Sequence, residues 1–183
     1  MFGQTLAYVA LVARDPVVPA ALLERQLGLA RVDRDDGHGG KVATFTAGET
    51  VIALFPVGHP FVGVDAPPGV HHIAFGAADL NKGIALVRDA GIAAAAHPKP
   101  GLGGRKRIAI EPTSLCGIRT WLTEPLDASA GRSSAVERID HIGVASGDNQ
   151  AAVAVWSQQL GCVVESQQTD MEMMIPVESF TSD

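Results

Sequence analysis

An eight-residue stretch that decides the fold occurs three times, as YVALVARD at residues 8–15, HIAFGAAD at 72–79 and HIGVASGD at 141–148. Each copy is a run of β-branched and small apolar residues that ends in an aspartate. Such a run predicts a β-strand, and aspartate is a preferred residue at the N-cap of a helix. The three copies therefore predict three strands that each lead into a helix.

Each predicted helix ends at a glycine, the residue type that favours a helix C-cap, at Gly28, Gly91 and Gly161. Further candidate strands follow at 41–46 and 51–56 in the first unit and at 93–97, 105–111 and 117–123 in the second. Each unit therefore reads β-α-β-β-β. The copies start 64 and 69 residues apart, which fits duplicated half-domains better than solenoid repeats.

These units predict an α+β fold of tandem βαβββ modules whose curled mixed sheets form a cleft. We assign residues 1–125 to a pair of modules, 1–66 and 67–125, because one module alone would leave an open sheet edge. The small and polar composition of residues 126–137 predicts a linker, and residues 138–183 predict an incomplete third module.

The composition indicates a globular protein with a small-molecule ligand. Of the 183 residues, 46% are hydrophobic, which is enough for a packed core. The net charge of -6 disfavours nucleic acids and anionic membranes as partners, because both would repel the protein. Apolar stretches such as 6–13 are far shorter than the roughly 20 residues of a membrane span. The N-terminus also lacks the basic residues with which a secretory signal begins, so we expect a cytoplasmic protein.

Paired βαβββ units that open with a His-Ile-Gly/Ala strand resemble the vicinal oxygen chelate superfamily, the glyoxalase, bleomycin-resistance and extradiol dioxygenase fold. Residues 69–124, with GVHHIAF, PKPGLGG and EPTSLCGIRTWL, resemble the second half of methylmalonyl-CoA epimerases. Residues 138–183, from RIDHIGV to the closing ESFTSD, resemble the start of the C-terminal domain of 4-hydroxyphenylpyruvate dioxygenase-like proteins.

The resemblance implies that each module supplies one metal ligand from its first strand and one from its last, for Fe, Zn, Mn, Co or Ni. Here these four positions fall on Tyr8, Ala53, His72 and Trp121, of which only His72 is a conventional ligand. A working metal site within residues 1–125 is therefore not expected. His141 stands where two-domain dioxygenases carry their first iron-binding histidine. His72 and His141 are thus the candidate metal ligands, and the resemblance leaves open that this chain holds no metal.

Strand alternation predicts which side chains share the inward face of the cleft: Tyr8, Ala53, Phe55, His72, Ala74, Arg119 and Trp121. An aromatic pocket with one fixed cation suits a flat or acyl ligand that carries a carboxylate. Candidate substrate-binding residues are accordingly Tyr8, Phe55, His72, Arg119 and Trp121. The alternative is that the aromatic side chains fill the cleft as core and that Arg119 points to solvent, since a one-residue shift in register turns every side chain to the other face.

Other polar residues have simpler interpretations. His71 is expected on the strand face opposite His72, and His38 in a solvated glycine-rich hairpin. The GLGGRKR stretch at 101–107 predicts a turn between strands, with phosphate binding as the alternative. Glu111 and Glu124 flank the last strand as weak candidates for a proton-transfer base.

Three functions remain open. The first, which the third module favours, is the N-terminal part of a tandem dioxygenase-like enzyme that acts through iron on a 2-oxo or aromatic carboxylic acid. The second is an epimerase-like or glyoxalase-like isomerase or lyase, and the third is a non-catalytic small-molecule binder. An unpaired sheet edge and the apolar stretch at 171–177 also predict a homodimer.

Overall fold

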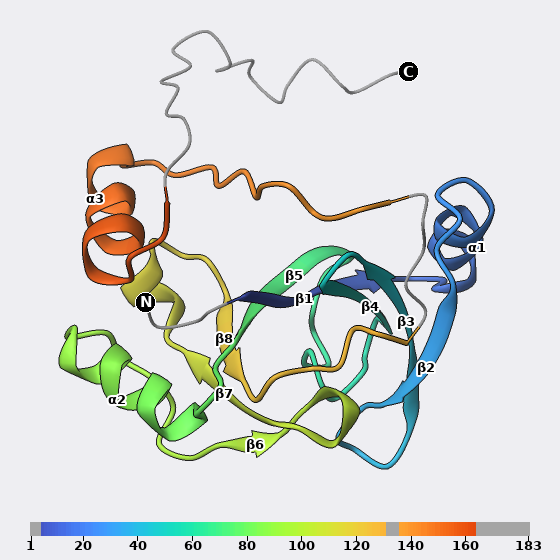
Figure 1. The fold of residues 1–183 in the computed structure, drawn as a ribbon, viewed down its shortest axis with the longest axis horizontal. Coiled ribbons are helices and arrows are strands. Elements are labelled where there is room, and N and C mark those ends of the chain that lie inside the picture. Colours follow the sequence, from blue (N-terminus) through green and yellow to red (C-terminus); the bar gives the residue numbers. More distant parts are fainter. Residues whose placement is uncertain (1–4, 131–135, 164–183) are drawn as a thin grey trace, which may run out of the picture.

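The computed structural model describes residues 5–130 and 136–163 (Figure 1). Its strands form one mixed sheet in the order β2-β3-β4-β1-β5-β8-β7-β6, and the sheet curls around a concave face as a half-barrel. Helices α1 and α2 pack on its convex side. This curled mixed sheet confirms the predicted α+β fold of βαβββ modules. In the described part of the chain, none of the helices is long and apolar enough to cross a membrane.

The first module holds five elements: β1 (Thr5–Ala13), α1 (Val17–Arg25), β2 (Arg31–Asp35), β3 (Lys41–Ala47) and β4 (Thr50–Pro56). The apolar pattern predicts β3 and β4 to within one residue. It misses β2, whose sequence RVDRD is mostly charged because this strand lies at the edge of the sheet and is largely exposed.

The second module repeats this order with β5 (Gly69–Gly76), α2 (Leu80–Asp89), β6 (Lys99–Pro100), β7 (Lys106–Ile110) and β8 (Thr120–Thr123). The predicted strand at 93–97 is wrong, since only an isolated bridge joins Ala94 to Ile110. The predicted strand at 117–123 begins late, at Thr120. Cys116 and Gly117 before it have φ of 55° and 86°, which is turn backbone rather than strand.

The predicted N-caps are confirmed for α2 at Asp79 and for α3 at Asp148, whereas the N-cap of α1 is Pro16, one residue after the predicted Asp15. Asp15, Asp79 and Asp148 each accept a hydrogen bond through the side chain from a backbone N–H of the following turn, at 3.0, 3.1 and 2.9 Å. The glycines after the helices, Gly28, Gly91 and Gly161, have φ of 64°, 76° and 71°, the left-handed region in which glycine carries no steric penalty. The sequence repeat therefore marks the helix termini of α2 and α3 closely, and those of α1 to within two residues.

The two modules join along one seam. Strand β1 pairs in parallel with β4 of its own module and antiparallel with β5, and β5 pairs in parallel with β8. Apolar side chains then form one cluster on the concave face and two on the convex face. Helix α2 covers one convex cluster, with Val87 and Leu122 fully buried, and α1 covers the other, with Phe45 buried.

The third repeat folds only in part. Residues 141–147, predicted as a strand, have no strand structure, because no strand of the described chain lies beside them, whereas β1 and β5 are each paired on both sides. The predicted helix does form, as α3 (Asn149–Val153) continued by a π-helix at Ala154–Gln159. Residues 164–183, including the stretch on which the homodimer prediction rests, lie outside the described residues.

The start of the predicted linker is packed. Residues 126–130, here called the strap, cross from β8 to β2 and β3 (Figure 1). Leu126 and Ala128 pack against the concave cluster. Arg34 of β2 donates to the carbonyl oxygen of Asp127 at 2.6 Å, and Thr46 of β3 donates to that of Ala130 at 2.9 Å. The strap therefore lies across the concave face, with Leu126 beside Gly103 of the second module and with its carbonyl oxygens held by β2 and β3 of the first.

Replacing Asp79 with Ala tests the helix caps. The Lys82 N–H would lose its acceptor, so we expect the free energy of unfolding to fall by about 1 kcal/mol. Urea denaturation followed by circular dichroism measures this. Asp89→Ala, at the other end of α2, is the matched control and should change stability much less; equal losses for both variants would contradict the capping role.

Candidate functional site

The four positions for which the resemblance implies metal ligands lie together in the concave cluster. Tyr8, Ala53 and His72 are almost wholly buried, and Trp121 is 8% exposed. The Tyr8 hydroxyl lies 3.3 Å from Nε2 of His72, and the Trp121 ring stacks on the His72 ring with centroids 3.5 Å apart. These side chains fill the space between the strands.

A bulge in β5 brings a second histidine to the same face. Ala10 pairs with His72 and Leu11 with Val70, so His71 has no partner in β1. As a result Nδ1 of His71 lies 2.7 Å from Nδ1 of His72, and the prediction that the two rings point to opposite faces is wrong. Burial, and then the nearby charges of His71, Arg107 and Arg119, hold the pKa of His72 well below its ordinary value. Both effects favour the neutral form of the His72 ring.

These side chains do not fit a divalent metal ion. Both ring nitrogens of His72 lie within hydrogen-bond distance of other side chains, and Ala53 and Trp121 offer no ligand atom. Burial raises the pKa of Tyr8, so its phenol keeps the proton that a metal would have to displace. No group of three or more His, Cys, Asp or Glu side chains suited to a metal occurs within residues 5–130 and 136–163.

The second candidate ligand, His141, lies apart from His72. Its side chain is 71% exposed, 3.6 Å from Asp140, in the segment that follows the strap. That segment lines a cavity of about 690 Å³ with Ile73 and Phe75, whose side chains point to the convex face because their neighbours His72 and Ala74 point to the concave one. The two predicted metal ligands therefore lie on opposite sides of the sheet.

Phe61 completes the aromatic cluster, and sequence reasoning missed it. It lies in the connector between β4 and β5, where no periodicity indicates which side chains are buried. Its ring stacks on Phe55 with centroids 4.6 Å apart and planes at 8°, and it meets the Trp121 ring edge-on at 5.2 Å. The connector thus forms one wall of the cleft.

The cation of the cleft is Arg107 rather than the predicted Arg119. Arg119 is exposed and lies just before β8, whereas Arg107 on β7 is 7% exposed. Its guanidinium carbon lies 3.7 Å from the Trp121 ring centroid and 4.2 Å from that of Phe61. The alternation of the predicted strand 105–111 places residue 107 on the same face as Ala109, a signal that could have found it.

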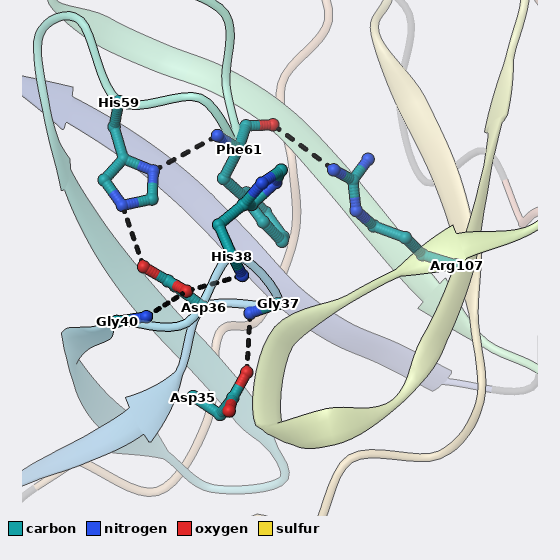
Figure 2. Close-up of polar contacts among 8 residues, drawn as sticks. All are labelled: Asp35, Asp36, Gly37, His38, Gly40, His59, Phe61 and Arg107. Atoms are coloured by element: carbon teal, nitrogen blue, oxygen red, sulfur yellow. Dashed lines mark hydrogen bonds and ion pairs between the residues drawn. The ribbon is translucent and has the colours of Figure 1, made fainter.

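A buried polar network fixes the Phe61 wall (Figure 2). Asp36 Oδ1 accepts from the backbone N–H groups of His38 and Gly40 at 2.7 and 3.0 Å, and Asp36 Oδ2 lies 3.1 Å from Nε2 of His59. The Phe61 N–H donates to Nδ1 of His59 at 3.2 Å, so the ring proton is on Nε2 and is donated to Asp36. The hairpin predicted to be solvated is therefore anchored by a carboxylate that is 4% exposed.

Beside this wall a cavity of about 260 Å³ remains between the connector and the second module. Its lining includes Phe61, Val62, Lys99, Arg107 and Trp121. Of the predicted substrate-binding residues, Trp121 borders this cavity, whereas Tyr8, Phe55 and His72 are buried in the cluster behind it.

The candidate bases are placed as follows. Glu111 is exposed at the end of β7. Glu124 accepts a hydrogen bond from the Lys106 N–H through Oε2 at 2.8 Å. The 101–107 stretch folds as a turn closed by a hydrogen bond from the Gly101 N–H to the Arg105 carbonyl oxygen at 2.6 Å.

Comparison with known proteins agrees with this architecture. A family model described as the glyoxalase/bleomycin resistance protein/dioxygenase superfamily matches residues 5–122.

A structure of Streptomyces coelicolor methylmalonyl-CoA epimerase is similar over 68% of this chain and 99% of its own, with 19% identity and a TM-score of 0.60. The Mycobacterium tuberculosis epimerase is similar over 69% and 91%, with 18% identity and a TM-score of 0.58. A hypothetical protein from Bacillus halodurans is similar over 67% and 95%, with 21% identity and a TM-score of 0.57. At these identities the likeness shows the fold alone. No curated protein sequence matches the chain.

The Asp36 network predicts a pH-dependent stability. Burial alone would raise the pKa of Asp36, but hydrogen bonds from His38, Gly40 and His59 outweigh burial and hold that pKa below its ordinary value. A carboxyl whose pKa is lowered by folding stabilises the protein above the unfolded pKa of about 3.9, and this stability is lost as the pH falls through the folded pKa.

We expect Asp36→Asn to be about 2 kcal/mol less stable near neutral pH, and to lose less further stability than the wild type on acidification to about pH 3. Urea unfolding at both pH values measures this. Asp65→Asn, at an exposed position in the connector, is the control and should follow the wild type. Parallel pH curves for Asp36→Asn and the wild type would contradict the assignment.

Proposed function

Because the chain belongs to the glyoxalase/bleomycin resistance protein/dioxygenase superfamily, we propose that it is a member that binds a small molecule in its cleft without a metal ion and without converting it. The observation that carries the proposal is the side-chain set at the four ligand positions. A neutral histidine bonded on both nitrogens, a protonated buried tyrosine, an alanine and a tryptophan do not hold a divalent cation.

The cavity beside Trp121 is where the ligand would lie. Its volume of about 260 Å³ suits a compact molecule, and the Trp121 and Phe61 rings offer flat apolar surface. One similar solved structure holds methylmalonyl-CoA, a small acid joined to a carrier. We carry over only the general class, a small organic molecule. Isomerase or lyase chemistry of the epimerase kind gains no support from this site, since three of the four ligand positions lack a conventional ligand.

A second candidate is the N-terminal half of a tandem dioxygenase-like enzyme, whose iron would be held by a further pair of modules that includes His141. The third set of helix caps, at Asp148 and Gly161, favours it because it repeats those of the complete modules. The reading frame downstream of codon 183 tests this candidate. It should encode another histidine and a glutamate at the remaining ligand positions, and a stop codon directly after Asp183 would refute it.

Trp121 fluorescence tests the binding proposal. In a Trp156→Phe background, titration with phenylacetate and phenylacetamide should give a saturable change for at least one probe, and EDTA should leave it unchanged. Ala109→Leu would place a larger side chain in the cavity and should weaken binding about tenfold. Ala151→Leu, exposed on α3, is the matched control. A response that requires added metal, or that Ala109→Leu leaves intact, would refute the proposal.

A further inference from the structure

The cavity beside Trp121 is lined by charge of one sign. Its lining includes Phe61, Val62, Lys99, Arg107 and Trp121. Of all the residues that line it, Lys99 and Arg107 are cationic and none is acidic. The chain as a whole carries a net charge of -6, so a basic lining is contrary to its overall charge. The local potential therefore favours an anion.

The two cations face each other across a strand pair. Lys99 of β6 is the register partner of Arg107 of β7, and both side chains line the cavity. Like charges at directly opposed positions destabilise an antiparallel pair. An anion lying between them would convert this repulsion into two attractive contacts.

Arg107 has no anionic partner among the residues that the structure describes. Its guanidinium donates to the carbonyl oxygens of Pro100 at 3.0 Å and Phe61 at 3.4 Å, which uses two of its five N–H groups. No carboxylate of the described chain lies within ion-pair distance of it. Burial lowers the pKa of Arg107, and only Tyr8 opposes this effect. In the described part of the chain, two carbonyl oxygens and two aromatic rings, but no carboxylate, offset the desolvation of this cation.

The ring stacking leaves the planar edge of Arg107 as the place for a partner. Phe61 and Trp121 both pack on the guanidinium at cation–π distance. A carboxylate binds a guanidinium in its plane, through two parallel N–H···O contacts. The rings that hold Arg107 thus also select the direction from which an anion approaches.

We propose that this cavity binds a small organic carboxylate whose anionic group lies between Arg107 and Lys99 and whose flat or apolar body packs on Phe61, Val62 and Trp121. The inference rests on the proposed binding function and names its ligand class. Asp36 and His59 serve this site as positioning residues, because the contact from His59 to the Phe61 N–H fixes the wall and the carbonyl that Arg107 bonds (Figure 2).

Isothermal titration calorimetry with phenylacetate and phenylacetamide tests the inference. The two probes share a ring and a chain length but differ in charge. The wild type should bind phenylacetate about tenfold or more tightly than the amide, and added NaCl should weaken only the acid. Lys99→Met, at the rim of the cavity, and Arg107→Met should each reduce the preference for the acid over the amide. Arg107→Lys keeps a positive charge and should therefore show more of this preference than Arg107→Met.

Lys106→Ala is the matched control, since Lys106 is an exposed neighbour of Arg107 that does not line the cavity. Its affinities should equal those of the wild type. If Arg107→Met does not fold, two measurements still test the carboxylate inference. These are the affinities of Lys99→Met and the comparison of the two probes on the wild type. Equal binding of acid and amide would overturn the carboxylate inference and leave the binding function standing. Binding of neither probe would overturn both.

Discussion

The antiparallel pairing of β1 with β5 is the constraint on which the rest of the molecule depends. Each of these strands is bonded on its other side to the last strand of its own module, so the seam makes one sheet from two. The sheet then has a single concave face, which places Tyr8 against His72 although 64 residues separate them. Without the seam, each module would expose its first strand and half of the aromatic cluster.

On the concave face, the side chains at the four positions for which the resemblance implies metal ligands pack against one another. Buried polar groups need partners, and here Tyr8, His72 and His71 satisfy one another in a row. The positive charge of Arg107 is held by the faces of two rings, an interaction worth about 0.5 to 2 kcal/mol for each ring, rather than by a carboxylate. The cavity proposed as the ligand site therefore lies toward β6 and β7 rather than at the centre of the half-barrel.

Short-range patterns in the sequence were enough to predict the modules, because the aspartate caps and left-handed glycines act within one or two turns. Strand alternation also placed Tyr8, Phe55, His72 and Trp121 on one face. It failed for His71, which a bulge reorients, whereas Arg119 precedes its strand and is exposed, which is the alternative that the sequence left open. Phe61 and the pairing of Asp36 with His59 could not be predicted, since both depend on how a connector folds back over the sheet. The strand expected at 141 needs partners that the described chain does not supply.

The strap competes with free molecules for part of the space in the cleft. A segment tethered directly after β8 stays close to the concave face at an effective concentration in the millimolar range, whatever the concentration of the protein. A free molecule that needed the space taken by Leu126 and Ala128 would have to displace it against that concentration, while one entering beside β7 would not. The covalent continuity of the chain thus keeps Leu126 and Ala128 on the concave cluster, apart from the cavity beside Trp121, which neither residue lines.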